Sequence, residues 1–236
     1  MKFTQKLSQA WQRWDSFWMN EAPPHAIALF RVLGGAWLLF YWLGFAPHVR
    51  LMFSHEGIAI PLFPFEAPSL QVAWLLYGAF ILCLLLVTLG ILFRVASAGA
   101  FILGAYHWFV SLHHFGTSFD LLYIFLLLCL ALSEADATYS LQMLWDKGSV
   151  FAWKPVSIFA QRLITAQITM TYFGVAMQKL WLPDFQGGEI LSWSFIGLWA
   201  TPIAFWTVQH IHSMLVFDWW NFLVKICEIA LPIGLW

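Results

Sequence analysis

The sequence predicts an all-helical (all-α) membrane protein: a polytopic bundle of about five to six transmembrane helices, preceded by an amphipathic helix in the membrane interface. Two observations predict this class. Of the 236 residues, 61% are hydrophobic and only 10% are charged, against about 25% charged in ordinary soluble domains. Apolar runs near the roughly 20 residues that cross a ~30 Å hydrocarbon layer recur along the chain. The 11 basic and 12 acidic residues are too few to coat a soluble domain of this size.

The first 20 residues have the pattern of an interfacial helix. Trp11, Trp14 and Trp18 recur at i, i+3 and i+7, which places them on one helix face, while basic and polar side chains occupy the other. A tryptophan-rich face opposite a basic face is typical of a helix that lies in the plane of the membrane interface. Pro23 and Pro24 should end this helix and turn the chain into the bilayer.

Residues 1–22 are therefore predicted as the interfacial helix, and residues 23–236 as the transmembrane domain. Its apolar segments are predicted at about 25–46, 70–93, 95–115, 118–134, 157–181 and 214–236. Residues 135–156 are polar and should carry a short surface helix, and residues 182–213 should include a partly embedded helix. The last apolar run reaches Trp236 without a polar tail, so we expect the sequence to be truncated at its C-terminal end.

The basic residues predict the orientation. With the N-terminus in the cytoplasm, the inner side receives Lys2, Lys6, Arg13, Arg94, Lys147 and Lys154, whereas Arg50 lies in an outer loop. This distribution follows the positive-inside rule. The predicted location is therefore the membrane itself, with the N-terminus cytoplasmic. Seven of the eight histidines then lie at or beyond the outer end of the membrane: His48, His55, His107, His113, His114, His210 and His212.

Ionisable side chains inside the spanning segments are candidates for function, because each costs at least ~2.5 kcal/mol on insertion scales. Arg31 lies in the first segment, where snorkelling to the cytoplasmic headgroups or a structural ion pair would account for it. Asp120 opens the fourth segment, where an acidic side chain complements the helix dipole. Its position near the outer histidines also makes it a tentative catalytic residue.

The fifth segment carries Gln167 and, at its outer end, Lys179. Gln167 can form an interhelical hydrogen bond, so we expect it to be structural. Apolar packing around Lys179 would favour its uncharged form and make it a usable base. An ordinary lysine at a helix end would instead snorkel to the headgroups. The residues alone leave both alternatives open.

The last segment carries a polar stripe: Asp218, Asn221, Lys225 and Glu228 recur at i, i+3, i+7 and i+10. These positions share one helix face, which must point to the bundle interior, a cavity or another subunit. Lys225 and Glu228 are spaced to pair within the helix. We interpret the stripe as structural.

Metal and nucleic-acid binding are not predicted. The histidines that could offer metal ligands are His113, His114, His210 and His212, but they are weak candidates because no carboxylate completes a recognised spacing. The three cysteines lie inside apolar runs and have the pattern of small buried side chains. The net charge of −1 gives no basis for a nucleic-acid partner.

Several short motifs, in order, carry a family resemblance. They are the run Ala-Leu-Phe-Arg-Val-Leu-Gly-Gly over residues 28–35, then Gln167 with Tyr172, then Lys179-Leu180, then Gly187-Gly188. This pattern resembles the HTTM (horizontally transferred transmembrane) domain family, which includes the membrane part of vitamin K-dependent gamma-carboxylase. The resemblance runs from about residue 22 to the end and implies the polytopic helical fold. It also implies that Lys179 stands where the carboxylase has its catalytic base, that Gln167 and Tyr172 match in position, and that a quinone is the candidate cofactor.

The sequence departs from the carboxylase at two of its functional positions. Gln178 precedes Lys179 where the carboxylase has a second lysine, and Phe119 stands where it has a functional histidine. Nothing in the sequence corresponds to the large extramembrane domain that recognises its protein substrate. The resemblance therefore supports the fold more than the full carboxylation reaction.

Two functions follow as hypotheses. The favoured one is a non-catalytic membrane subunit that packs against other membrane proteins, lipids or pigments. The alternative is a carboxylase-like membrane enzyme in which Lys179, assisted by Asp120, acts as general base on a quinone or lipid-like substrate at the non-cytoplasmic face. Under both hypotheses the partners include membrane lipids. The sequence does not choose between them decisively.

Overall fold

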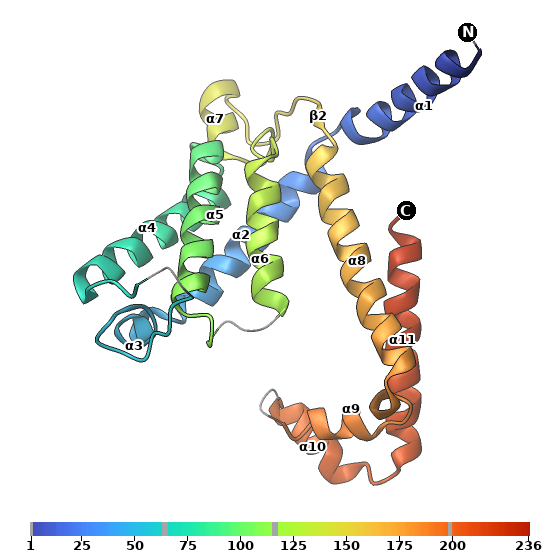
Figure 1. Ribbon diagram of the computed structural model, residues 1–236. Coiled ribbons are helices and arrows are strands. Elements are labelled where there is room, and N and C mark those ends of the chain that lie inside the picture. Colours follow the sequence, from blue (N-terminus) through green and yellow to red (C-terminus); the bar gives the residue numbers. More distant parts are fainter. Residues whose placement is uncertain (1, 63–65, 115–117, 198–199) are drawn as a thin grey trace. The chain divides into compact units, whose positions relative to one another are not determined.

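A computed structural model describes residues 2–62, 66–114, 118–197 and 200–236 as an almost entirely helical chain (Figure 1). It divides into two compact units, Met1–Leu163 and Ile164–Trp236. The first contains α1 (Lys2–Met19), α2 (His25–Leu43), η1 (Ala46–His48), α3 (Val49–Phe53), α4 (Leu70–Leu89), α5 (Phe93–Val110), α6 (Ser118–Ala131) and α7 (Leu141–Lys147), with the strands β1 (Glu21–Ala22) and β2 (Val156–Ser157). Helix α8 (Phe159–Trp181) begins in this unit and continues into the second, where η2 (Pro183–Phe185), α9 (Glu189–Ser194), α10 (Pro202–His210) and α11 (Met214–Gly234) follow.

The all-helical prediction is confirmed, and each predicted apolar segment coincides with a helix. The short surface helix expected within residues 135–156 is α7, which begins where the Ser140 hydroxyl accepts a hydrogen bond from the backbone N–H of Met143 at 3.1 Å. Such a cap satisfies one of the orphan donors of the first helical turn. The end of the segment predicted over 95–115 lies outside the described residues.

The number of membrane spans stays a prediction. Among the described residues, two helices are both at least 18 residues long and apolar enough to cross a membrane, namely α2 and α4. The apolar part of α6, Phe119–Ala131, is shorter. Helix α8 has the length to cross but carries polar side chains such as Arg162 and Gln167.

The core of the first unit lies where α2, α4, α5 and α6 pack against one another in chain order (Figure 1). Aromatic side chains fill its centre. Trp42 of α2 packs edge-on against Phe80 of α4, with ring centroids 4.8 Å apart, and Phe53 of α3 packs edge-on against His107 of α5 at the same distance. These four side chains are almost fully buried. Large aromatic rings in contact contribute packing energy beyond the area that they bury.

Arg31, in the first half of α2, bonds two separate segments through its guanidinium. Nη1 donates to the carbonyl oxygens of Val87 and Thr88 at 2.8 and 2.6 Å, in the last turn of α4. Nε donates to the carbonyl of Ala135 at 3.1 Å and Nη2 to that of Tyr139 at 2.6 Å. The residue has no exposed surface. It therefore does not snorkel to the headgroups, and its charge is compensated by carbonyl dipoles.

The sequence predicted that this apolar segment would end at residue 93, but α4 ends at Leu89. Gly90 follows the helix with φ +69°, a left-handed conformation that ends the helix and that glycine adopts without strain. A Cβ atom there would lie 2.9 Å from Arg31 Nη1 and 2.4 Å from the Cβ of Ser140. Gly90 thus leaves the space through which the Arg31 guanidinium reaches the carbonyls of the last helical turn.

The connection between α6 and β2 is also tied to α5 by a cluster of charges. Glu134 binds Lys154 Nζ at 2.8 Å and Arg94 Nη2 at 3.1 Å. The hydrogen bond from Lys154, together with the charges of Lys154 and Arg94, holds the pKa of Glu134 below its ordinary value against the opposing effect of partial burial. All three side chains are more than a third exposed, so this cluster adds little to stability.

Replacing Arg31 by lysine should destabilise the first unit. Lysine keeps the charge but lacks the planar fork, so it cannot bind four carbonyls of two segments at once. We expect a loss of about 2 kcal/mol or more, the value of one or more charged hydrogen bonds left unmade. Thermal unfolding of the detergent-purified protein, followed by the monomer peak in size-exclusion chromatography, measures it. Arg94→Lys, at an exposed position, is the control and should change the unfolding temperature little. Equal stability of R31K and wild type would contradict the role given to Arg31.

Candidate functional site

In the first unit, Asp120 lies in the first turn of α6 and is buried among aromatic side chains. Its Oδ1 accepts a hydrogen bond from the Tyr41 hydroxyl of α2 at 3.3 Å. The ring of Tyr41 also lies 5.7 Å from that of Tyr123, one turn further along α6. Only 7% of Asp120 is exposed. The carboxylate therefore links α6 to α2 in addition to complementing the dipole of its own helix.

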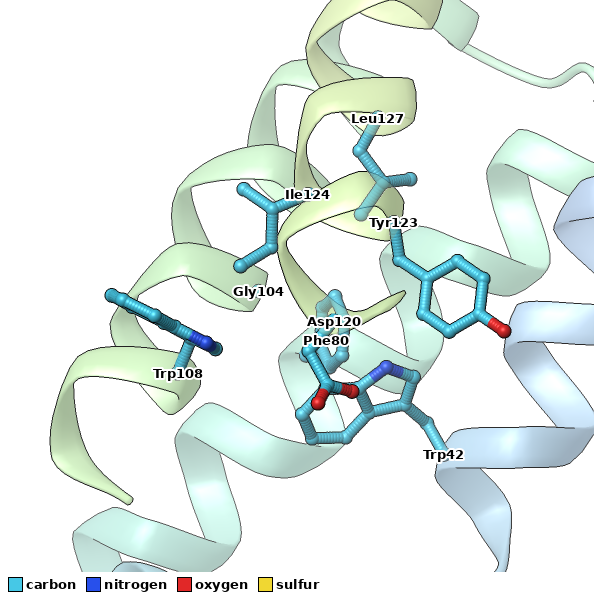
Figure 2. Close-up of a pocket in the computed structure, with 8 residues that line it drawn as sticks. All are labelled: Trp42, Phe80, Gly104, Trp108, Asp120, Tyr123, Ile124 and Leu127. Carbon is cyan, nitrogen blue, oxygen red and sulfur yellow. The ribbon is translucent and has the colours of Figure 1, made fainter. Parts of the chain in front are cut away.

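A small cavity adjoins this carboxylate. Figure 2 shows Asp120 beside Trp42, with Trp108 and Tyr123 also on the cavity wall. The volume of about 10 Å³ is room for a single water molecule. An engineered cavity of about 150 Å³ is known to take a benzene ring. The site can thus hold a hydrogen-bonded water next to Asp120, and it does not fit a quinone ring.

His107 is a buried polar side chain, and its burial was not predicted from the sequence. Its Nδ1 is 2.7 Å from the carbonyl oxygen of Leu103, which accepts, so Nδ1 carries the proton and Nε2 is the acceptor. Nε2 is buried and has no hydrogen-bond partner among the described residues. The ring packs between Phe80 and Phe53. In the sequence, His107 had the pattern of a residue at the membrane surface. The small and apolar residues on its own helix face, Ala100, Gly104 and Val110, were the available signal of burial.

In the second unit, Lys179 of α8 forms an ion pair with Glu228 of α11. The contact joins Nζ to Oε1, and the two side chains are 18% and 13% exposed. The ring of Phe185 lies 5.8 Å from Nζ. Lys179 therefore does not extend to the headgroups, and its amine is paired with a carboxylate. Glu228 pairs with this lysine on another helix, although Lys225 on its own helix was the partner expected from the spacing.

The other polar residues of the α11 stripe hold the turn that follows η2. The backbone N–H of Gly188 donates to Asp218 Oδ1 at 2.5 Å. Asn221 Nδ2 donates to the carbonyl oxygens of Phe185 and Gly187 at 2.8 and 2.6 Å. A Cβ atom on Gly188 would lie 2.3 Å from the backbone of Phe217, so only glycine lets the turn lie flush on α11. The stripe thereby fixes Phe185 beside Lys179.

Gln167 and Tyr172 lie on α8 before Lys179. Gln167 Nε2 donates to the hydroxyl of Thr171 at 3.3 Å, within the same helix. The interhelical bond expected for Gln167 is therefore replaced by one to its own helix. Tyr172 is 41% exposed. A further bond between the helices comes from Trp236, whose Nε1 donates to the Thr169 hydroxyl at 2.8 Å.

The four histidines named as weak metal candidates form local contacts. The rings of His113 and His114 lie 3.8 Å apart, and His114 Nδ1 is 2.9 Å from the Ser111 hydroxyl. Burial, and then the neighbouring His113, lower the pKa of His114. His210 Nδ1 lies 2.8 Å from the Trp206 carbonyl, and His212 is exposed. Within the described ranges, no three His, Cys, Asp or Glu residues gather as metal ligands would.

The fold and these contacts define the class of protein. A nonpolar environment requires apolar helices whose charged side chains are bonded to carbonyls or to one another. The helices described above have both properties. This is a membrane-associated helical protein. The HTTM domain family model matches residues 19–233, nearly the whole chain, and the chain belongs to the HTTM domain family. The resemblance found in the sequence is thereby confirmed. No curated protein and no solved structure matches the chain.

Proposed function

We propose that this HTTM protein is a non-catalytic, multi-pass membrane subunit that packs against other membrane proteins, lipids or pigments. The proposal includes about five to six spans and a cytoplasmic N-terminus. The observation that carries it is the use of the buried charges. Arg31 binds four carbonyl oxygens, Lys179 binds Glu228, and Asp218 binds a backbone N–H. Each of these charges serves to join elements of the chain.

The groove on α11 supports a packing role. Leu215, Asp218, Trp219 and Phe222 line an open groove of about 260 Å³. Trp219 and Phe222 are 64% and 51% exposed. Large aromatic side chains of this kind are the usual anchors of protein interfaces, where they contribute a large share of the binding energy. An apolar helix face or the ring of a pigment would fill such a groove.

The charged cluster of Glu134 supports the proposed orientation. It brings Arg94 and Lys154 to the same end of the first unit, and both belong to the basic set assigned to the cytoplasm. The positive-inside rule then places the connection between α6 and β2 inside. The opposite assignment would leave that set of basic residues on the outer side.

If α11 packs against another membrane protein, the double variant Trp219→Ala/Phe222→Ala should no longer bind that protein. Affinity purification in mild detergent, followed by protein and small-molecule mass spectrometry, measures what accompanies the wild type and each variant. We expect a stoichiometric membrane component with the wild type, reduced at least about tenfold by the double variant, as for loss of interface anchors. Trp37→Ala/Phe40→Ala, at exposed positions on α2, is the matched control and should retain it. A stable monomer accompanied by bulk lipid alone would contradict the proposal.

A second candidate function is favoured by one specific observation. Glu228 Oε2 is buried and has no hydrogen-bond partner among the described residues, although Oε1 of the same carboxylate binds Lys179. An unsatisfied carboxylate oxygen in an apolar surrounding is costly. A catalytic base must be oriented by a neighbouring group, and Glu228 is the group in contact with the Lys179 amine. The pair of Lys179 and Glu228 is the basis of this alternative, a carboxylase-like enzyme with Lys179 as base. The alternative keeps Asp120 as a tentative assistant and a quinone or lipid-like substrate at the non-cytoplasmic face.

Oxygen-dependent consumption of a reduced naphthoquinone by the purified protein tests this second candidate. The cavity at Asp120 does not fit the ring, so the enzyme hypothesis requires the substrate to bind elsewhere, at Lys179. We expect Lys179→Met to lower the rate at least about 100-fold, the usual contribution of a positioned base. Lys225→Met removes a lysine from the same polar stripe and should leave the rate unchanged. A rate for the wild type equal to that of K179M would eliminate the enzyme.

A further inference from the structure

A groove of about 290 Å³ lies between α1 and the start of α8, within the first unit. Trp11, Trp14 and Trp18 line it from α1, together with Asp15, and Phe159 lines it from α8. None of these residues belongs to the clusters at Asp120 or at Lys179. The ligand of this groove is therefore a matter separate from the proposed function. Three indole rings and one carboxylate are available to bind it.

The groove is held in place by contacts on both of its sides. Strand β1, directly after α1, pairs antiparallel with β2, directly before α8. The backbone N–H of Ile158 donates to the carbonyl of Asn20 at 2.9 Å, and the rings of Trp18 and Phe159 lie 6.2 Å apart. The Arg162 guanidinium lies 4.3 Å from the centre of the Phe17 ring. These contacts fix the end of α1 against α8, so the lining residues keep their arrangement.

The lining has the chemistry of a cation site. The faces of indole rings attract cations more strongly than those of any other side chain, and recognition of quaternary ammonium groups uses such aromatic cages. Asp15 adds a full negative charge between Trp14 and Trp18, and it is the one acidic residue in the sequence of α1. A carboxylate on the aromatic face of an otherwise basic helix is not needed for insertion into the interface, because basic residues and tryptophans suffice there.

The surroundings of the groove name the source of such a cation. A zwitterionic phospholipid headgroup carries an ammonium next to its phosphate, so it offers a cation without a net charge. The predicted place of α1 is the membrane interface, which is where such headgroups lie.

We propose that this groove binds the headgroup of a zwitterionic phospholipid, with the ammonium between the indole rings and Asp15. Charge complementarity selects this occupant: an anionic headgroup would place its net charge against Asp15, and an acyl chain offers no positive charge to pair with the carboxylate. A quaternary ammonium, as in phosphatidylcholine, fits an aromatic cage best because its charge is spread over methyl groups that contact ring faces.

Selective lipid retention by the full chain tests the proposal. The purified protein is equilibrated with mixed micelles that contain equal amounts of phosphatidylcholine and phosphatidylglycerol with the same acyl chains. After size exclusion, the two retained lipids are measured by mass spectrometry. We expect about threefold or greater preference for phosphatidylcholine, in keeping with a partly exposed cation–π site. Asp15→Asn and Trp14→Leu should each abolish the preference, whereas the control Asp146→Asn, at an exposed position on α7, should keep it.

Each other outcome overturns the proposal. Equal retention of the two lipids by the wild type would show that the groove does not select an ammonium. An unchanged preference in both D15N and W14L would place the selectivity elsewhere on the protein. Tighter binding of free phosphocholine than of phosphatidylcholine would assign the groove to a soluble ligand rather than to a lipid. Asp15→Asn preserves size and lies on an exposed helix face, so the size-exclusion profile of this variant should match that of the wild type.

Discussion

A charge inside an apolar helical bundle must be compensated there, and this constraint explains how the structure of the first unit is organised. Arg31 meets it with four carbonyl oxygens, and the nearby negative charge of Asp136 also favours the charged guanidinium. Two of the oxygens belong to the last turn of α4, where the helix dipole favours a cation. The other two belong to the loop after α6. One buried guanidinium thus fixes the end of one helix, the course of a loop and the position of α2 between them.

The second unit solves the same problem with side chains. Lys179 and Glu228 neutralise each other between α8 and α11, and Asp218 and Asn221 bond the backbone of the turn at Gly187-Gly188. Asp218, Asn221 and Glu228 of the polar stripe on α11 therefore bond other parts of this unit, while Trp219 and Phe222 beside them remain exposed. This division of α11 into a bonded face and an open aromatic face is the physical basis of the proposed packing role. The enzymatic alternative depends on a different observation: the buried Oε2 of Glu228 has no hydrogen-bond partner among the described residues.

The sequence predicted the positions of the helices well because apolar runs of the right length are a local signal. It predicted the start of α4 at Leu70, and it placed the end four residues late because the apolar run continues past Gly90, whose left-handed conformation ends the helix. The partners of the polar groups could not be predicted. Arg31 bonds residues 56 to 108 positions away, and Lys179 bonds a residue 49 positions away. From the spacing along the helix, only Lys225 could be predicted as the partner of Glu228. The periodicity of one helix does not show which other helix it contacts.

The central claim is that the intramembrane charges serve packing, and a double-mutant cycle on Lys179 and Glu228 tests it most directly. The unfolding free energies of Lys179→Met, Glu228→Met and the double variant are compared with that of the wild type in the same detergent. Removing one partner leaves an uncompensated buried charge, so each single variant should lose about 3 kcal/mol. The double variant should recover most of that loss, because two apolar side chains replace a closed ion pair. Losses that simply add in the double variant, or single variants as stable as the wild type, would contradict the account.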